Sequence, residues 1–128
     1  MKVIVSDPIS DDGLKIFYDN NIDVVDATNS IIDENYEHIP TANAWVIRSG
    51  TTLNASIISK ADKLAVIGRA GVGIDNIDIS AATRKGVVVM NTPDANTISA
   101  AEHTMALLLC LSRNVSYGHH SILSGNWD

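Results

Sequence analysis

Residues 65–73 read AVIGRAGVG, a short apolar run that ends in an arginine and two closely spaced glycines. A run of this length and composition is typical of a buried strand, and glycines directly after it favour a tight loop. The pattern recurs along the chain, in the apolar runs Lys2–Ser6, Ile22–Ala27, Ala44–Ile47, Ala65–Gly68 and Val87–Met90. Their starting positions are about 20 to 22 residues apart, the length of one strand, one helix and two short loops.

The apolar composition also favours parallel strands. The chain has 128 residues, enough for one domain, and contains sixteen Ile and eleven Val against eight Leu and six aromatic residues. Such β-branched side chains suit strands that are buried on both faces of a sheet. Length and composition therefore indicate a single α/β domain.

Helical patterns lie between and after the apolar runs, at Ser10–Asn20, Asp33–Ile39, Asn54–Ala61, Asp78–Lys85 and Thr97–Leu111. The pattern at Asp33–Ile39 is the weakest of them. In the first helix, the spacing of the apolar side chains predicts that Leu14, Ile16 and Phe17 face inward.

Capping residues support these helices. Ser10, Asn54, Asp78 and Thr97 stand at or near the expected N-termini, and Gly86 follows the helix that ends at Lys85. Strand and helix alternate five times, and the connections between parallel strands are right-handed. The alternation predicts a flavodoxin-like fold: a five-stranded parallel sheet of order 2-1-3-4-5 with helices on both faces.

The charge balance limits the possible partners. Nine Lys and Arg against fifteen Asp and Glu give a formal net charge of −6, which repels nucleic acids and anionic membrane surfaces. The single Cys110 cannot form an internal disulfide, and the first apolar run is too short for a signal peptide. These features predict a cytoplasmic protein, in which any anionic ligand is held by local groups.

Two arginines mark a candidate anion site. In doubly wound sheets ligands bind outside the carboxyl ends of the strands, and Arg48 and Arg69 each stand at such an end. Guanidinium groups grip carboxylates and phosphates with a planar fork, and Gly71 and Gly73 let the backbone approach a ligand closely. The alternative is a pair of ion pairs to Asp7 or Asp75, which would leave no site.

Other chemistries fit the sequence less well. The segment that starts at Gly71 resembles a dinucleotide fingerprint, but Asn76 occupies the sixth place of G-x-G-x-x-G, where Gly is needed. The four histidines have no metal-ligand spacing, and no base stands near Ser49, Thr51 or Thr52. We therefore expect neither a metal site nor a nucleophile.

Longer stretches carry a resemblance to a known family. They are Arg48–Thr51, Leu64–Asp78, Gly86–Pro93, Ser99–His103 and Ser124–Trp127. Through them nearly the whole chain resembles the D-2-hydroxyacid dehydrogenases. Members of that family have a flavodoxin-like substrate lobe and an inserted Rossmann lobe that binds NAD and carries most catalytic residues. The resemblance implies an NAD-dependent oxidoreductase whose glycine fingerprint and catalytic Arg, Glu and His lie beyond Asp128, so that no catalytic residue stands in this chain.

The resemblance also assigns binding residues. Those for a small anionic substrate are Arg48, Ser49, Arg69, Gly71, Val72, Gly73 and Asn96. Val72 and Ala100 would contact the cofactor across the cleft, although the family often has a hydroxyl at the position of Ala100. Because relatives that act on uncharged side chains often lack the arginine at position 69, the resemblance favours a phosphorylated 2-hydroxy acid.

The resemblance also implies how the chain is organised. Residues 1–96 would form the substrate-binding lobe, and residues 97–128 the long inter-lobe helix and the start of the crossing to the Rossmann lobe. That helix carries apolar residues around most of its circumference, which predicts a homo-oligomer. One other class of protein stays open: a stand-alone flavodoxin-like module that binds small anions and performs no chemistry.

Overall fold

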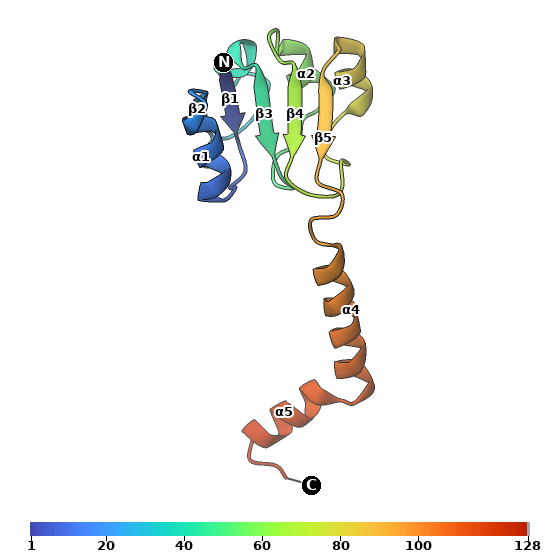
Figure 1. The fold of residues 1–128 in the computed structure, drawn as a ribbon. Coiled ribbons are helices and arrows are strands. Elements are labelled where there is room, and N and C mark those ends of the chain that lie inside the picture. The colour runs from blue at the N-terminus through green and yellow to red at the C-terminus, as the bar shows by residue number, and fades with distance from the viewer. Residues whose placement is uncertain (128) are drawn as a thin grey trace. The chain divides into compact units, whose positions relative to one another are not determined.

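The computed structural model describes residues 1–127, and the chain divides into a first unit, Met1–Ala95, and a second unit that begins at Asn96. The strands of the first unit are β1 (Lys2–Val5), β2 (Asp23–Asp26), β3 (Ala44–Ile47), β4 (Val66–Arg69) and β5 (Val88–Asn91). Its helices are α1 (Asp11–Asp19), α2 (Ala55–Lys60), α3 (Ile79–Lys85) and a 3-10 turn, η1 (Ile39–Thr41). All neighbouring strands are parallel in the order β2-β1-β3-β4-β5, which confirms the predicted topology (Figure 1).

The strand register separates a buried face from a partly exposed one. Ile4, Trp45, Ile67 and Val89 form one row across the sheet, and the next row is Val5, Val46, Gly68 and Met90. The first row lies in the main core with side chains of α2, α3 and η1. On the other face α1 contributes Gly13 and Phe17 to a groove beside Val46. Helices therefore lie on both faces, as expected.

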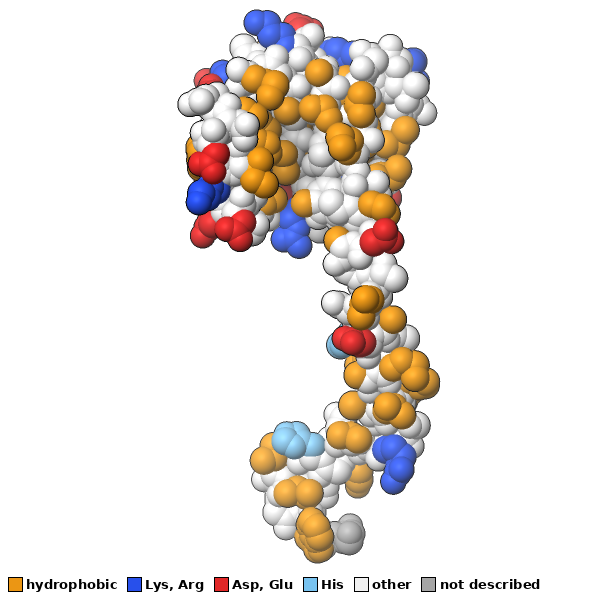
Figure 2. Space-filling view, viewed as in Figure 1, with side chains coloured by type: hydrophobic (Ala, Val, Ile, Leu, Met, Phe, Trp, Pro, Cys, Tyr) orange, Lys and Arg blue, Asp and Glu red, His pale blue; other side chains and the backbone are white. Residues whose placement is uncertain are grey.

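The face that carries α1 is only partly covered. Val88 and Met90 of β5 are 57% and 59% exposed, and Ile16 of α1 is 63% exposed. Figure 2 shows hydrophobic side chains gathered beside α1 on this face. The prediction that Ile16 faces inward is wrong, because α1 contacts the strands at one edge of the sheet and Ile16 borders the groove instead. Leu14 and Phe17 are half-buried.

Capping explains where the helices of the first unit begin and end. The side chains of Ser10, Asn54 and Asp78 accept hydrogen bonds from backbone N–H groups in the first turns of α1, α2 and α3. Gly86 ends α3 in the left-handed conformation, at φ 73°, which glycine adopts without steric cost. These four predicted caps are confirmed.

One predicted helix of the first unit is absent. Residues 33–38 form turns, and only η1 follows them, so the helix predicted at Asp33–Ile39 is wrong. The Asp33 carboxylate accepts a hydrogen bond from the N–H of Asn35 at 2.7 Å, a local turn that competes with helix formation. Pro40 then limits the segment to a short 3-10 turn.

The second unit consists of two helices, α4 (Thr97–Ser112) and α5 (Val115–Leu123). Every side chain of α4 is exposed, including Leu108 at 56% and Leu111 at 77%. Thr97, expected at or near the N-terminus of this helix, is the first residue of α4. Asn96 is the N-cap, and its side chain accepts no hydrogen bond there. α5 was not predicted. Among residues 1–127, no helix has the length and hydrophobicity to span a membrane.

The asymmetry between the two faces can be tested in the first unit. Replacing Ile67 by Ala leaves a cavity in the main core and should lower the free energy of unfolding by about 2–5 kcal/mol. The matched change Val88→Ala, one strand away on the exposed face, should cost less than about 1 kcal/mol. Chemical denaturation measures both values. Equal losses would mean that the exposed face is packed as tightly as the core.

Candidate functional site

Four chain segments meet at the carboxyl edge of the sheet. They follow β1, β3, β4 and β5, and the register Ile47↔Arg69↔Asn91 aligns the last three strands at this edge. Because parallel strands end at the same edge, residues far apart in sequence become neighbours there. Arg69 is the last residue of β4, and the other candidate site residues of the first unit, from Arg48 to Gly73, lie in these segments.

Asp7, the second residue after β1, organises the segment that follows β3. Its Oδ2 accepts hydrogen bonds from the N–H of Arg48 at 2.6 Å and from the N–H of Thr51 at 3.0 Å. A Cβ at Gly50 would collide with Asp7 Oδ1, so only glycine fits beside this carboxylate. Asp7 is 7% exposed and therefore binds the backbone of the loop from the protein interior.

A second contact anchors the same loop. The Ser6 hydroxyl lies 2.9 Å from Trp45 Nε1, which donates to it, and 2.9 Å from Thr51 Oγ1. Ser6 and Thr51 are each 6% exposed. Polar groups at this depth are satisfied by one another rather than by water. The loop is therefore held to β1 by its backbone and by one of its side chains.

Neither arginine forms the ion pair that was the alternative to a binding role. Within residues 1–127 the ion pairs are His38–Glu37, Lys60–Glu34 and Lys85–Asp62. The Asp7 carboxylate binds backbone N–H groups instead. The guanidinium groups of Arg48 and Arg69 thus have no carboxylate partner in the part of the chain that the structure describes.

Arg69 folds back over its own loop. A Cβ at Gly71 would collide with Arg69 Nη1, so the glycine provides the room for this guanidinium. Arg69 Nε is buried and has no hydrogen-bond partner among residues 1–127. A buried, unpaired donor on a cation is costly to maintain, and an anionic ligand would relieve that cost.

Arg48 lies on the face of the sheet that carries α1, opposite to the face of Arg69. It is exposed, and Nη1 donates to the carbonyl of Pro8 at 3.4 Å, a long bond that leaves most of the donor capacity free. The side chain borders a groove of about 580 Å³ between α1 and β3. The two arginines therefore start from adjacent strand ends and approach the carboxyl edge from different faces.

The loop after β4 offers backbone donors. Asn91 Nδ2 donates to Val72 O at 2.7 Å, and the Thr92 N–H donates to Gly71 O at 3.0 Å, which ties the loop to β5. Both bonds use carbonyl groups of the loop. The N–H groups of Val72 and Gly73 have no acceptor among residues 1–127 and are available to a ligand.

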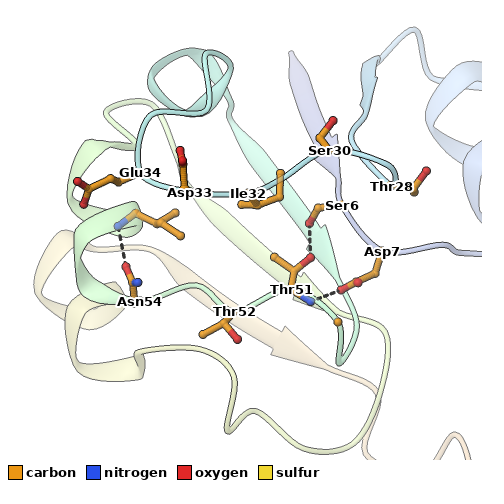
Figure 3. A pocket seen from close by; sticks show the side chains of 12 residues that line it. Ser6, Asp7, Thr28, Ser30, Ile32, Asp33, Glu34, Thr51, Thr52 and Asn54 are labelled. Carbon is orange, nitrogen blue, oxygen red and sulfur yellow. Dashed lines mark hydrogen bonds between the residues drawn. The ribbon is translucent and has the colours of Figure 1, made fainter.

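A cavity of about 660 Å³ lies beside these loops, on the side of the main core. Ser6, Asp7 and Thr51 form one wall, and Asp33 and Glu34 stand on the opposite side (Figure 3). No Lys or Arg lines it, so its charge disfavours an anion. At its rim Thr28 lowers the pKa of Asp26, because its backbone N–H and its hydroxyl donate to the carboxylate. Neither Arg48 nor Arg69 lines this cavity, so an anionic substrate fits the residues around the two arginines better.

The remaining candidate residues have simple placements. Ser49 is exposed between Arg48 and Gly50, while Asn96 and Ala100 belong to the second unit, where both are exposed. No group of three or more His, Cys, Asp or Glu side chains within residues 1–127 could hold a metal ion.

Known proteins are similar to this chain in sequence and in fold. The family model of the catalytic domain of the D-isomer specific 2-hydroxyacid dehydrogenases matches residues 3–123. The chain belongs to this family. The resemblance found in the sequence is therefore confirmed at the level of the dehydrogenase family.

Individual relatives agree with this assignment. The D-3-phosphoglycerate dehydrogenase of Methanocaldococcus jannaschii is 47% identical over 128 residues, which are 100% of this chain and 24% of that protein. The chain thus spans about a quarter of the length of this dehydrogenase.

Solved structures show the same fold. A crystal structure of a protein from Thermus thermophilus has a TM-score of 0.88 at 25% identity, covering 100% of this chain and 42% of the other. The NAD⁺-bound 3-phosphoglycerate dehydrogenase of Entamoeba histolytica has a TM-score of 0.71 at 30% identity, covering 86% and 38%.

Sequence reasoning missed the two residues that shape the dehydrogenase loops. It treated Asp7 only as a possible ion-pair partner and Asn76 only as a mismatch to the dinucleotide fingerprint. Asn76 Nδ2 donates to the carbonyl groups of Arg48 and Thr51, each at 2.6 Å. For Asp7, the one local signal was its place as a polar residue shortly after a strand. The sequence contained no local signal for the role of Asn76.

Proposed function

We propose that the chain is the N-terminal, substrate-binding part of an NAD-dependent D-3-phosphoglycerate dehydrogenase. That enzyme oxidises 3-phospho-D-glycerate to 3-phosphohydroxypyruvate, at the entry to serine biosynthesis. The M. jannaschii relative of that name supports the choice among 2-hydroxyacid dehydrogenases. The observation that carries the proposal is the pair of arginines, Arg48 and Arg69, which have no carboxylate partner among residues 1–127.

The substrate has two acidic groups, and the carboxyl edge offers donors for both. Arg48 and Arg69 bind them as cations, with Ser49 and Gly71 beside them. The free N–H groups of Val72 and Gly73 hold the carboxylate, and the family resemblance assigns Asn96 to substrate binding as well. Each guanidinium can give two parallel hydrogen bonds to a carboxylate or phosphate, which accounts for selectivity toward a doubly charged acid.

The residues of this chain bind and orient the substrate, and the proton and hydride steps belong to groups outside residues 1–128. NAD, when bound, would supply the hydride acceptor for oxidation at C2, and the reaction would yield the keto acid, NADH and a proton. The family resemblance assigns cofactor contacts to Val72, which is 41% exposed, and to Ala100. The chain has no phosphate-binding glycine loop, so these residues suit one wall of the cofactor site and not the whole site.

The proposed organisation has two parts. Residues 1–96 form the substrate-binding lobe, and residues 97–128 form the inter-lobe helix with the start of the crossing. The division of the chain at Asn96 supports this boundary.

Cys110 is an exposed free thiol, which suits the reducing cytoplasm in which we place the enzyme.

We also propose that the protein is a homo-oligomer. The leucines of α4 are exposed around the helix, and exposed apolar surface of this extent is usually buried against a partner.

Neutralising Arg69 tests the substrate assignment in the full-length enzyme. Arg69→Gln should lower kcat/KM for 3-phosphoglycerate by roughly 30- to 800-fold, or about 2–4 kcal/mol, because a desolvated charge pair is lost. A 2-hydroxy acid without phosphate should be affected much less. Arg84→Gln, an exposed arginine on α3, is the control and should change neither value. Equal losses for both substrates would overturn the phosphate assignment.

The division of labour can be tested with residues 1–128 alone. With NAD and 3-phosphoglycerate this polypeptide should produce no NADH, and its dissociation constant for NAD should be millimolar or weaker, since one wall of the site offers few contacts. Absorbance at the NADH band and calorimetric titration measure the two quantities. Turnover by this polypeptide would contradict the proposed division.

Sedimentation tests the oligomer. At tens of micromolar the protein should sediment as a dimer or larger species, and Leu108→Glu or Leu111→Glu should shift it toward monomer. Ser99→Glu adds the same charge to an exposed position of α4 and should leave the mass unchanged. A monomer before mutation would refute self-association through α4.

A further inference from the structure

Asn76 connects the two loops that carry the candidate anion site. It stands in the loop after β4, and its Nδ2 donates to the carbonyl oxygens of Arg48 and Thr51 in the loop after β3, each at 2.6 Å. Since a carbonyl oxygen can only accept, the amide must present its NH₂ group to this pair. Both hydrogens of that group are therefore in use.

The other half of the amide is unpaired. Asn76 Oδ1 is buried and has no hydrogen-bond partner within residues 1–127. A buried acceptor without a partner costs about 1–3 kcal/mol, so this side chain does not maximise stability. Because both hydrogens of Nδ2 are in use, the Asn76 side chain has no free donor and cannot itself bind an anion.

The two loops are joined by their backbones as well. The Leu53 N–H donates to Asn76 O, and the Asp78 N–H donates to Leu53 O, both at 2.9 Å. Leu53 and Ile77 form an isolated parallel bridge at the same place. The loop after β3 is thus bonded to the loop after β4 along residues 48–53.

Asp7 and Asn76 both bind the backbone of the same two residues, Arg48 and Thr51. Asp7 Oδ2 accepts the N–H of Arg48 and of Thr51, and Asn76 Nδ2 binds the carbonyl of each. The backbone on both sides of Arg48 is therefore fixed, although its side chain is exposed. Through Asn76, this position is fixed relative to the loop that holds Arg69 and the free N–H groups.

We propose that Asn76 is a positioning residue of the substrate site, which sets the separation between Arg48 and the anion-binding loop after β4. This inference rests on the proposed function, since it assumes that both loops bind one substrate. Asn76 does not touch the substrate. It acts by keeping two cationic or N–H donor groups at the spacing that one doubly charged acid requires.

The test compares two asparagine side chains in the full-length enzyme. Asn76→Ala removes both bonds to the loop after β3. Asn43→Ala is the matched control, because Asn43 Oδ1 accepts the N–H of Lys2 at 2.9 Å at the amino end of the sheet. Both variants should lose stability. Only Asn76→Ala should raise KM for 3-phosphoglycerate, by about ten-fold, with kcat changed less than about three-fold, as expected for lost substrate binding.

A second variant keeps the proposal testable if Asn76→Ala does not fold. Asn76→Ser retains one donor and should give a smaller rise in KM. Relative to the unmutated enzyme, its amide hydrogens should exchange faster at residues 48–52 than those of the core do. Equal KM values for the Asn76 and Asn43 variants would overturn the role of Asn76. If the unmutated enzyme does not oxidise 3-phosphoglycerate, or if Arg69→Gln leaves its KM and kcat unchanged, the proposed function fails instead.

Discussion

The buried carboxylate of Asp7 accepts two backbone N–H groups, from Arg48 and Thr51, and the geometry of the carboxyl edge depends on this contact. A charged acceptor satisfies buried N–H groups more strongly than a neutral one does. It also leaves the Arg48 guanidinium without a carboxylate partner at this position. One side chain thus orders the loop and keeps the adjacent arginine available for an external anion.

The distribution of charge follows the same logic. The chain carries a net charge of −6, and the cavity beside the carboxyl edge is lined in part by Asp7, Asp33 and Glu34. Selectivity for an anion must therefore come from a small number of local donors rather than from the overall field. Arg48, Arg69 and the free N–H groups after β4 are such donors, and none of these residues lines the cavity.

The two faces of the sheet explain how this edge is supported. Packing of α2, α3 and η1 against one face produces a core in which Trp45 and Ile67 are fully buried. That core fixes the ends of β3 and β4, from which both arginines emerge. The opposite face, with Val88 and Met90 exposed, contributes less to holding the strand ends.

The sequence by itself determined the five strands to within one residue at either end, the three helix caps Ser10, Asn54 and Asp78, the glycine stop at Gly86 and the parallel order. These features depend on local spacing and on bonds between near neighbours, which a sequence pattern records. Only the tertiary structure decided that Asp33–Ile39 forms turns, that Ile16 is exposed, and that Asp7 and Asn76 grip the same loop. The bonds of Asp7 and Asn76 to Arg48 span 41 and 28 residues, and such contacts exist only once the strands have been brought side by side.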